Sequence, residues 1–180
     1  YKAKGRPSDH PLIIHISNLK NLDLWARDIP EYAIKLARAF WPGPMTLILP
    51  RTDLAKDFIT GGQNNVGLRI PNQEVALALI SEFEKLGGYG IAAPSANRFG
   101  AVSPTTAQAV EAELGQYLSA NDQILDGGSC EVGVESTIID CTGSTPIILR
   151  PGAITAAMIF AATEFEPMSA NKVDIKAPGL

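Results

Sequence analysis

The pattern that decides the fold class lies in residues 88–100, which read Gly88-Tyr89-Gly90-Ile91-Ala92-Ala93-Pro94-Ser95-Ala96-Asn97-Arg98-Phe99-Gly100. Within this stretch, Ile91 to Ala93 is typical of a short buried strand. Pro94 ends the strand, because proline has no N–H to give to a sheet, and a polar turn with Ser95 and Asn97 follows. Polar side chains that follow a strand lie at the edge of the sheet, where α/β proteins bind ligands.

A helix start is predicted directly after this turn. Ser103 is a favourable N-cap residue and Pro104 a favourable first helical residue, so the sequence predicts a helix over 105–118. The free backbone N–H groups of such a helix start attract phosphate. Two interpretations are open at this point: a ligand site at the strand–helix junction, or a capped helix after a proline turn.

Helical and strand patterns alternate along the rest of the chain, which predicts an α/β fold. Apolar residues recur with helical spacing over 30–40 and 73–86, and a short helix is predicted over 53–59. Strands are predicted over 12–16, 45–49, 66–70, 123–126, 134–140 and 147–150. Several connections between 126 and 149 carry no helical pattern, so we expect a mixed sheet and not a purely parallel one.

Length and composition predict one globular domain. The chain has 180 residues, and 46% hydrophobic against 19% charged residues is the balance of a folded protein. The formal net charge of −4 provides no overall basic field for nucleic acid, although a local basic patch is compatible with it.

The cysteines and the apolar segments favour the cytoplasm. Cys130 and Cys141 lack C-x-x-C spacing and are too few for a zinc site, so two buried, reduced thiols are favoured over a disulfide. No apolar run is long enough to span a bilayer, and no segment resembles a signal peptide. We therefore predict a cytoplasmic protein without a membrane segment.

Several catalytic motifs are absent from the sequence. It contains no G-x-S-x-G elbow, no phosphate-binding G-x-x-x-x-G-K-S/T loop and no G-x-G-x-x-G fingerprint, and no acidic or histidine cluster has metal-ligand spacing. What remains at strand ends and in turns is a set of cations and small polar residues: Lys4, Arg6, Arg69, Arg150, Ser95, Asn97, Ser103, Ser136 and Thr137. Such a set binds and orients anions, which suits nucleotide chemistry governed by positioning and charge neutralisation.

A second interpretation is open for four residues: Lys4, Arg6, His15 and Arg69. Lys4 and Arg6 point to one side of an extended segment and suit a polyphosphate, but so short a cluster is also typical of a solvated terminus. His15, in the middle of an aliphatic strand, is more typical of a core residue than of a functional one. Arg69 between Leu68 and Ile70 is either buried beside an anion or exposed on an edge strand.

A series of motifs, in this order, resembles the YrdC-like family, whose members are threonylcarbamoyl-AMP synthases. The motifs are Lys4-Gly5-Arg6-Pro7, Trp41-Pro42-Gly43-Pro44-Met45-Thr46, Gly67-Leu68-Arg69-Ile70-Pro71, Ala93-Pro94-Ser95-Ala96-Asn97, Val134-Glu135-Ser136-Thr137 and Leu149-Arg150-Pro151-Gly152. The resemblance extends from Tyr1 to about Ile154 and implies a twisted, mixed sheet with flanking helices around a large open cavity. It also implies a nucleotidyltransferase that makes L-threonylcarbamoyladenylate and pyrophosphate from ATP, L-threonine and bicarbonate, for modification of a tRNA adenosine near the anticodon.

The resemblance assigns roles to individual residues. The family's K-x-R and S-x-N signatures match Lys4, Arg6, Ser95 and Asn97, which are the implied catalytic residues. ATP-binding roles are implied for Arg6, His10, Asn65, Ser95, Ser103 and Arg150, and threonine-binding roles for His15, Arg69, Ala93 and Ser136. Mg²⁺ is expected to arrive with ATP and to be held through phosphate oxygens and water, without a dedicated protein site.

The resemblance also predicts the domain organisation and the partners. Residues 1–162 are expected to form the catalytic domain without its N-terminal segment, and residues 163–180 a linker toward a C-terminal domain. Partner proteins of tRNA modification are expected to take up the product, with direct tRNA contact as a further expectation. The alternative function is an RNA-binding module without catalysis, which the negative net charge disfavours.

Overall fold

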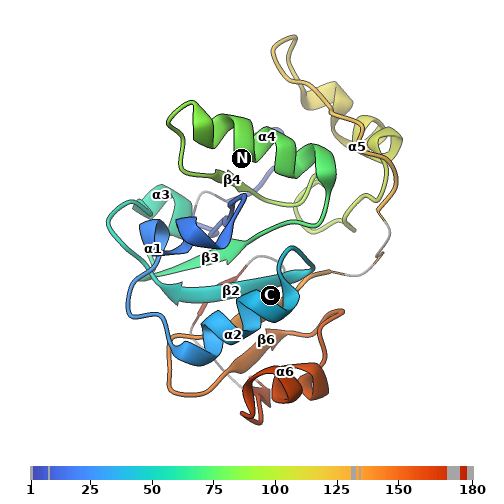
Figure 1. The fold of residues 1–180 in the computed structure, drawn as a ribbon. Helices are drawn as coiled ribbons and strands as arrows, with labels where there is room; N and C mark the ends of the chain where they lie inside the picture. Colours follow the sequence, from blue (N-terminus) through green and yellow to red (C-terminus); the bar gives the residue numbers. More distant parts are fainter. Residues whose placement is uncertain (1, 8, 131–132, 134, 170–174, 178–180) are drawn as a thin grey trace.

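The fold is built on one mixed sheet, seen in a computed structural model that describes residues 2–7, 9–130, 133, 135–169 and 175–177. Within these residues seven strands pair in the order β4-β1-β3-β2-β5-β6-β7 (Figure 1). The strands are β1 (Ile13–His15), β2 (Met45–Pro50), β3 (Asn65–Arg69), β4 (Ile91–Ala93), β5 (Thr137–Asp140), β6 (Ile147–Arg150) and β7 (Met168–Ser169). The helices are α1 (Leu22–Trp25), α2 (Glu31–Phe40), α3 (Asp57–Thr60), α4 (Glu74–Lys85), α5 (Ala107–Leu114) and α6 (Ala156–Thr163), with 3₁₀ turns at Leu19–Asn21 and Gly115–Tyr117.

The pairing confirms a mixed sheet. β1 pairs in parallel with β3 and antiparallel with β4, while β2 pairs antiparallel with β3 and in parallel with β5. The register places His15 beside Arg69 on one side and beside Ile91 on the other. β3 is thus a central strand, so the possibility that Arg69 sits on a sheet edge is excluded.

The main core lies where α2 covers the sheet. Tyr32, Ala33, Leu36 and Ala37 form one buried face of α2, at the spacing that brings helical residues to the same side. They pack against fully buried side chains of β2, among them Leu47. Figure 1 shows α4 beside β4 at one end of the sheet and α6 beside β6 at the other.

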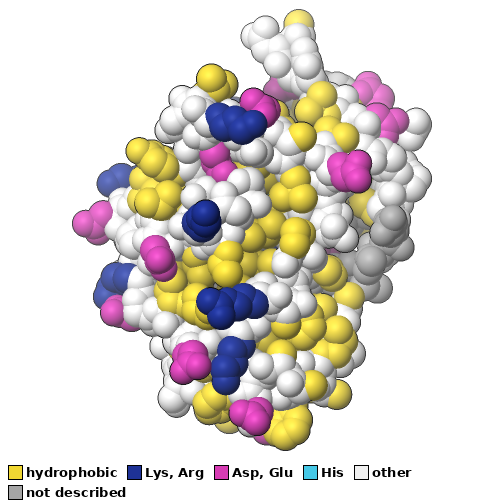
Figure 2. Space-filling model, viewed as in Figure 1, with side chains coloured by type: hydrophobic (Ala, Val, Ile, Leu, Met, Phe, Trp, Pro, Cys, Tyr) yellow, Lys and Arg dark blue, Asp and Glu magenta, His cyan; other side chains and the backbone are white. Residues whose placement is uncertain are grey.

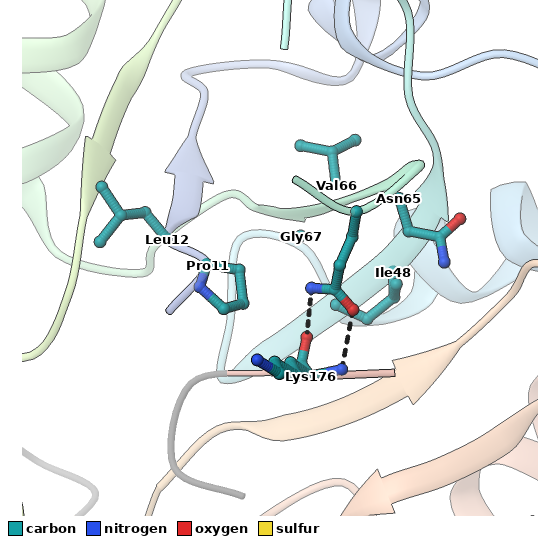
Figure 3. Close-up of a pocket in the computed structure, with 8 residues that line it drawn as sticks. Pro11, Leu12, Ile48, Asn65, Val66, Gly67 and Lys176 are labelled. Carbon is teal, nitrogen blue, oxygen red and sulfur yellow. Dashed lines mark hydrogen bonds between the residues drawn. The ribbon is translucent and has the colours of Figure 1, made fainter. Parts of the chain in front are cut away.

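A smaller apolar cluster joins the C-terminal segment to the sheet. Ala177 packs against Ile48, Ile138 and Leu149, with Ile175 alongside. Gln63 holds the neighbouring backbone: its Nε2 donates to the Lys176 oxygen at 2.9 Å, and its Oε1 accepts from the Lys176 nitrogen at 2.8 Å (Figure 3). The predicted linker therefore contains a stretch that packs on the domain, while 170–174 and 178–180 lie outside the described residues.

The prediction for the helix after the central stretch was wrong at its start. α5 begins at Ala107, and Thr106 is the N-cap, since its Oγ1 accepts from the Ala109 nitrogen at 3.1 Å. Ser103 does not cap this helix because its hydroxyl donates to Glu135 instead. At the other end, the helix gives way to a 3₁₀ turn at Gly115.

Other predicted elements also differ from the structure. The strand predicted over 123–126 is wrong: these residues form no strand, Leu125 is 57% exposed, and Asp126 accepts from the Gly128 nitrogen in a turn. The helix predicted over 53–59 begins only at Asp57, and α6 and β7 were not predicted. β5 begins at Thr137, and Val134 lies outside the described residues.

Two further findings concern the cysteines and the membrane. Cys141 is buried as predicted, but Cys130 is exposed, and both thiols are free. None of the helices in the described ranges has the length and hydropathy of a membrane-crossing segment.

Candidate active site

A cavity of about 430 Å³ opens beside strands β1 and β3 and the edge strand β4. The predicted site residues that line it come from distant parts of the chain: Lys4, Arg6, His10, His15, Arg69, Ala93, Ser95, Asn97, Ser103, Ser136 and Arg150. Ile13, Pro94, Phe99, Gly100, Ala101 and Glu135 complete the lining. The fold thus brings all but one of the predicted site residues to a single cavity.

Lys4 ties the N-terminal segment to the turn after β4. Its ammonium donates to the backbone oxygen of Ser95 at 2.6 Å and to that of Asn97, and the Phe99 nitrogen donates back to the Lys4 oxygen at 2.8 Å. Burial, and then the charge of Arg6, lower the pKa of Lys4. The interpretation of Lys4 and Arg6 as a solvated terminus is excluded, because each residue is only 9% exposed.

Arg6 lies on the same wall and contacts an aromatic pair. Its Nη2 donates to the Pro11 oxygen at 2.8 Å, and its guanidinium carbon lies 5.9 Å from the centre of the Phe99 ring. The His10 ring meets the Phe99 ring edge-on, with centroids 5.1 Å apart. Phe99 was not a predicted site residue, although it lies two residues after the S-x-N signature.

The amide nitrogen of Asn97 holds the turn, and its amide oxygen has no hydrogen-bond partner among the described residues. Its Nδ2 donates to the backbone oxygens of Arg98 and Ala101, each at 2.7 Å. Its Oδ1 is buried and has no hydrogen-bond partner among the described residues. A buried oxygen of this kind is costly unless a ligand or water donates a hydrogen bond to it.

Arg69 and His15 lie side by side on the cavity floor. Arg69 projects from the end of β3, and its Nε donates to the Gly43 oxygen at 3.0 Å. Burial, and then the charge of Arg150, lower the Arg69 pKa. Burial, and then the charge of Arg69, lower the His15 pKa to about 4, so the imidazole is neutral at physiological pH. The His15 Nδ1 is buried without a hydrogen-bond partner among the described residues.

Arg150 organises the opposite wall. Its Nε and Nη2 donate to the Ser136 backbone oxygen at 3.0 and 2.9 Å, and its Nη2 also donates to the Ser136 hydroxyl at 3.0 Å. Its Nη2 lies 3.2 Å from the Glu135 carboxylate, which accepts from the Ser103 hydroxyl at 2.5 Å. Burial lowers the Arg150 pKa, and the Glu135 carboxylate acts in the opposite direction.

Glu135 is a cavity residue that sequence reasoning missed. It belongs to the motif that ends in Ser136-Thr137, but only the serine received a role. The sequence did contain a signal for Glu135, because a carboxylate next to a predicted anion-binding residue needs a cationic partner nearby.

Asn65 lies apart from the other predicted site residues, and its ATP-binding role stays a prediction. Asn65 begins β3, whereas Arg69 ends it, and four steps of about 3.3 Å along the strand separate them by about 13 Å. Asn65 lines a separate hollow of about 10 Å³ together with Pro11, Ile48 and Lys176 (Figure 3). It does not belong to the lining of the large cavity.

The charge of the cavity differs from that of the surface. Figure 2 shows Lys and Arg mixed with Asp and Glu on the face in view, with an apolar band between them and no broad field of one sign. The described cavity lining, in contrast, carries Lys4, Arg6, Arg69 and Arg150 against the single carboxylate of Glu135. Such a lining favours an anionic ligand.

Comparisons with known proteins give a consistent result. The family model Sua5_yciO_yrdC, described as "Telomere recombination", matches residues 1–152. The chain is 47% identical to a threonylcarbamoyl-AMP synthase of Pyrococcus abyssi, over 86% of this chain and 43% of that protein. It is 45% identical to a threonylcarbamoyl-AMP synthase of Bacillus subtilis, over 88% of this chain and 44% of that protein.

Two solved structures have the same fold. The crystal structure of P. abyssi Sua5 complexed with L-threonine superposes with a TM-score of 0.88 at 43% identity and covers 99% of this chain and 52% of that one. A substituted form of P. abyssi Sua5 gives a TM-score of 0.89 at 43% identity and covers 99% and 51%. The chain thus spans about half the length of these relatives.

Proposed function

Because the chain belongs to the Sua5_yciO_yrdC family, we propose that it forms L-threonylcarbamoyladenylate and pyrophosphate from ATP, L-threonine and bicarbonate. The observation that carries the proposal is the convergence of four cationic side chains with Ser95, Asn97, Ser103 and Ser136 on one cavity. That cavity is of the size that binds small molecules.

The wall formed by Lys4, Arg6 and Ser95 is the proposed site of the ATP phosphates. The Lys4 ammonium gives two hydrogen bonds to backbone oxygens, which leaves one of its three N–H groups for a phosphate oxygen. Arg6 adds a second, permanently charged donor group beside it. His10, Ser103 and Arg150 would contact other parts of the nucleotide.

The floor formed by Arg69 and His15 is the proposed site of L-threonine. A guanidinium matches a carboxylate in shape and charge. A bound carboxylate would offset the cost of burying the charged Arg69 side chain, which is the main cause of its lowered pKa. Ala93 and Ser136 lie on the same cavity and would border the amino acid. The relative from P. abyssi was crystallised with L-threonine, which supports an amino acid subsite.

The proposed chemistry relies on positioning and charge neutralisation. The threonine amine and bicarbonate condense to a carbamate and release water. A carboxylate oxygen of this carbamate then attacks the α-phosphorus of ATP while the bond to the pyrophosphate oxygen breaks. Lys4, Arg6, Ser95 and Asn97 are the proposed catalytic residues, because charge on the transferred phosphate and on the leaving pyrophosphate develops at their wall. Removal of such a charged contact typically slows a reaction by about a hundredfold or more.

The cavity lining does not fit a resident magnesium site. Mg²⁺ prefers several oxygen ligands, yet Glu135 is the single carboxylate in the described lining. Among the described residues, no group of three or more His, Cys, Asp or Glu side chains could hold a metal ion. We propose that Mg²⁺ enters as part of the ATP substrate, and no step requires a protein ligand to it.

The proposed setting is tRNA modification in the cytoplasm, where ATP and tRNA are available. Partner proteins would transfer the threonylcarbamoyl group to the adenosine near the anticodon. A purely RNA-binding role is disfavoured, because the mixed charges of Figure 2 and the net charge of −4 provide no extended basic surface on the face in view.

Release of pyrophosphate tests the proposal. The chain is incubated with ATP and Mg²⁺, and L-threonine and bicarbonate are omitted in turn. Pyrophosphate should form only when all substrates are present, and mass spectrometry should detect the adenylate. Arg6→Gln should abolish the release, whereas Arg38→Gln, on the exposed side of α2, should not. Pyrophosphate release that is the same with and without L-threonine would contradict the proposal. RNA binding without pyrophosphate release would contradict it as well.

A further inference from the structure

The proposed substrates are mainly anionic and the cavity lining is mainly cationic, with one exception on each side. ATP, bicarbonate and the threonine carboxylate are anionic, and four cationic side chains face them. Apart from the Mg²⁺ that accompanies the ATP phosphates, the α-ammonium of threonine is the one cationic group among the proposed substrates. In the described cavity lining, Glu135 is the one anionic side chain, which leaves it as the available counter-charge for that ammonium.

The geometry of Glu135 leaves it able to accept a further hydrogen bond. One carboxylate oxygen accepts from Ser103 and the other pairs with Arg150, which fixes the direction of the side chain. A carboxylate has about four lone-pair sites, so these two contacts leave others free. The side chain is 51% exposed, so a ligand in the cavity can reach it.

Glu135 also lies near the proposed amino acid site. It is the chain neighbour of Ser136, whose hydroxyl accepts from Arg150. Its charge acts on Arg69, since the carboxylate raises the pKa that burial lowers. A zwitterionic α-amino acid carries an ammonium and a carboxylate. The Glu135 carboxylate and the Arg69 guanidinium, which line the same cavity, have the charges opposite to these two groups.

We propose that Glu135 accepts a hydrogen bond from the α-ammonium of the amino acid substrate, so that Glu135 and Arg69 together select a zwitterion. The inference rests on the function proposed above and assigns that site its specificity for an amine. An acid that lacks the amine should lose the Glu135 contact and keep the Arg69 contact.

The competing role for Glu135 is that of a counter-ion that holds Arg150 in place. In that role, its loss would loosen Arg150 and Ser136 and weaken every ligand of the cavity. The ammonium role affects only ligands that carry the amine. A pair of ligands that differ in this group alone therefore separates the two roles.

Calorimetric titration in the presence of ATP provides this test. The ligands are L-threonine and 3-hydroxybutanoate, which has the same carbon chain and hydroxyl group but no amine. The wild-type chain is compared with Glu135→Gln, which removes the charge, with Glu135→Asp, which keeps it on a shorter side chain, and with Glu111→Gln, an exposed control on α5.

Glu135→Gln should weaken L-threonine binding about ten- to a hundredfold, the usual effect of a charge-assisted hydrogen bond, and leave 3-hydroxybutanoate binding within about twofold. Glu135→Asp should recover part of the loss, and Glu111→Gln should bind both ligands as the wild type does. Equal losses for both ligands, or unchanged threonine binding, would overturn the inference while the proposed function stands. Failure of the wild-type chain to bind L-threonine would overturn both.

Discussion

The Lys4 ammonium lies 2.6 Å from the backbone oxygen of Ser95, a residue 91 positions further along the chain. The same ammonium donates to the Asn97 oxygen, so one cation holds both ends of the S-x-N signature. This contact confirms the prediction that Lys4, Arg6 and Ser95 converge on one cavity wall. It also gives Lys4 two tasks, since the group that would face a phosphate shapes the turn beside it.

Replacement of Lys4 by methionine should therefore destabilise the fold as well as weaken ATP binding. Methionine keeps most of the apolar stem but leaves the carbonyl groups of Ser95 and Asn97 without their donor. We expect the free energy of unfolding to fall by about 1.5–3 kcal/mol, the range for hydrogen bonds to a charged group. Urea denaturation measures this loss. The control is Lys2→Met, because Lys2 is exposed and should change stability by less than about 0.5 kcal/mol. Equal stability of the two variants would show that the Lys4 contacts contribute nothing.

Arg69→Lys should separate threonine binding from ATP binding. Lysine keeps the charge at the end of β3 but loses the planar pair of donors that matches a carboxylate. L-Threonine affinity should fall by about 1.5–3 kcal/mol, or roughly ten- to a hundredfold, while ATP affinity stays within a few fold. Calorimetric titration with each ligand measures both affinities.

The control for this substitution is Arg27→Lys, because Arg27 has a 62% exposed side chain away from the cavity lining. It should change neither affinity. Equal losses for ATP and threonine in Arg69→Lys would instead assign Arg69 to the nucleotide or to the fold, and unchanged threonine affinity would remove it from the site.

Individual residues show what the sequence could predict and why the rest escaped it. The strand around Arg69 was predictable from its apolar pattern, because that pattern is local. The contact between His15 and Arg69 was not, since it depends on the parallel pairing of β1 and β3. Ser103 had the residue type of an N-cap, but a distant carboxylate binds its hydroxyl, and Thr106 caps the helix instead.

The separate position of Asn65 leads to a further prediction. Asn65 and Asn97 were both assigned to the ligand site, but only Asn97 lines the large cavity. Asn97→Ala should weaken ATP binding at least tenfold, because it removes the buried Oδ1 and the two hydrogen bonds that hold the turn. Asn65→Ala should leave ATP binding within about twofold. Fluorescence titration with a labelled ATP analogue compares the two variants, and a large loss in Asn65→Ala would support the original assignment.

His15 should make the stability of the fold depend on pH below neutrality. Its pKa falls from 6.5 to about 4 in the folded chain, because burial and the neighbouring charge of Arg69 oppose its protonation. Between these two values, the unfolded chain binds a proton at His15 that the folded chain does not. The free energy of unfolding therefore has its full value above about pH 6.5 and decreases as the pH falls toward 4.

The size of this effect follows from the pKa difference and is isolated by removal of the imidazole. The His15 contribution to the pH-dependent loss of stability is about 3 kcal/mol between neutral pH and pH 4. His15→Gln keeps a polar side chain without a titrating group, so its stability should depend less steeply on pH over this window. Urea denaturation of both proteins at intervals from pH 7.5 to pH 4 gives the two curves, and titrating carboxylates cancel in their difference. The stability of the wild type relative to His15→Gln should fall by about 3 kcal/mol as the pH falls from neutral to 4. Parallel curves would mean that His15 binds a proton equally well in the folded chain, and the packing of a neutral imidazole against Arg69 would then be excluded.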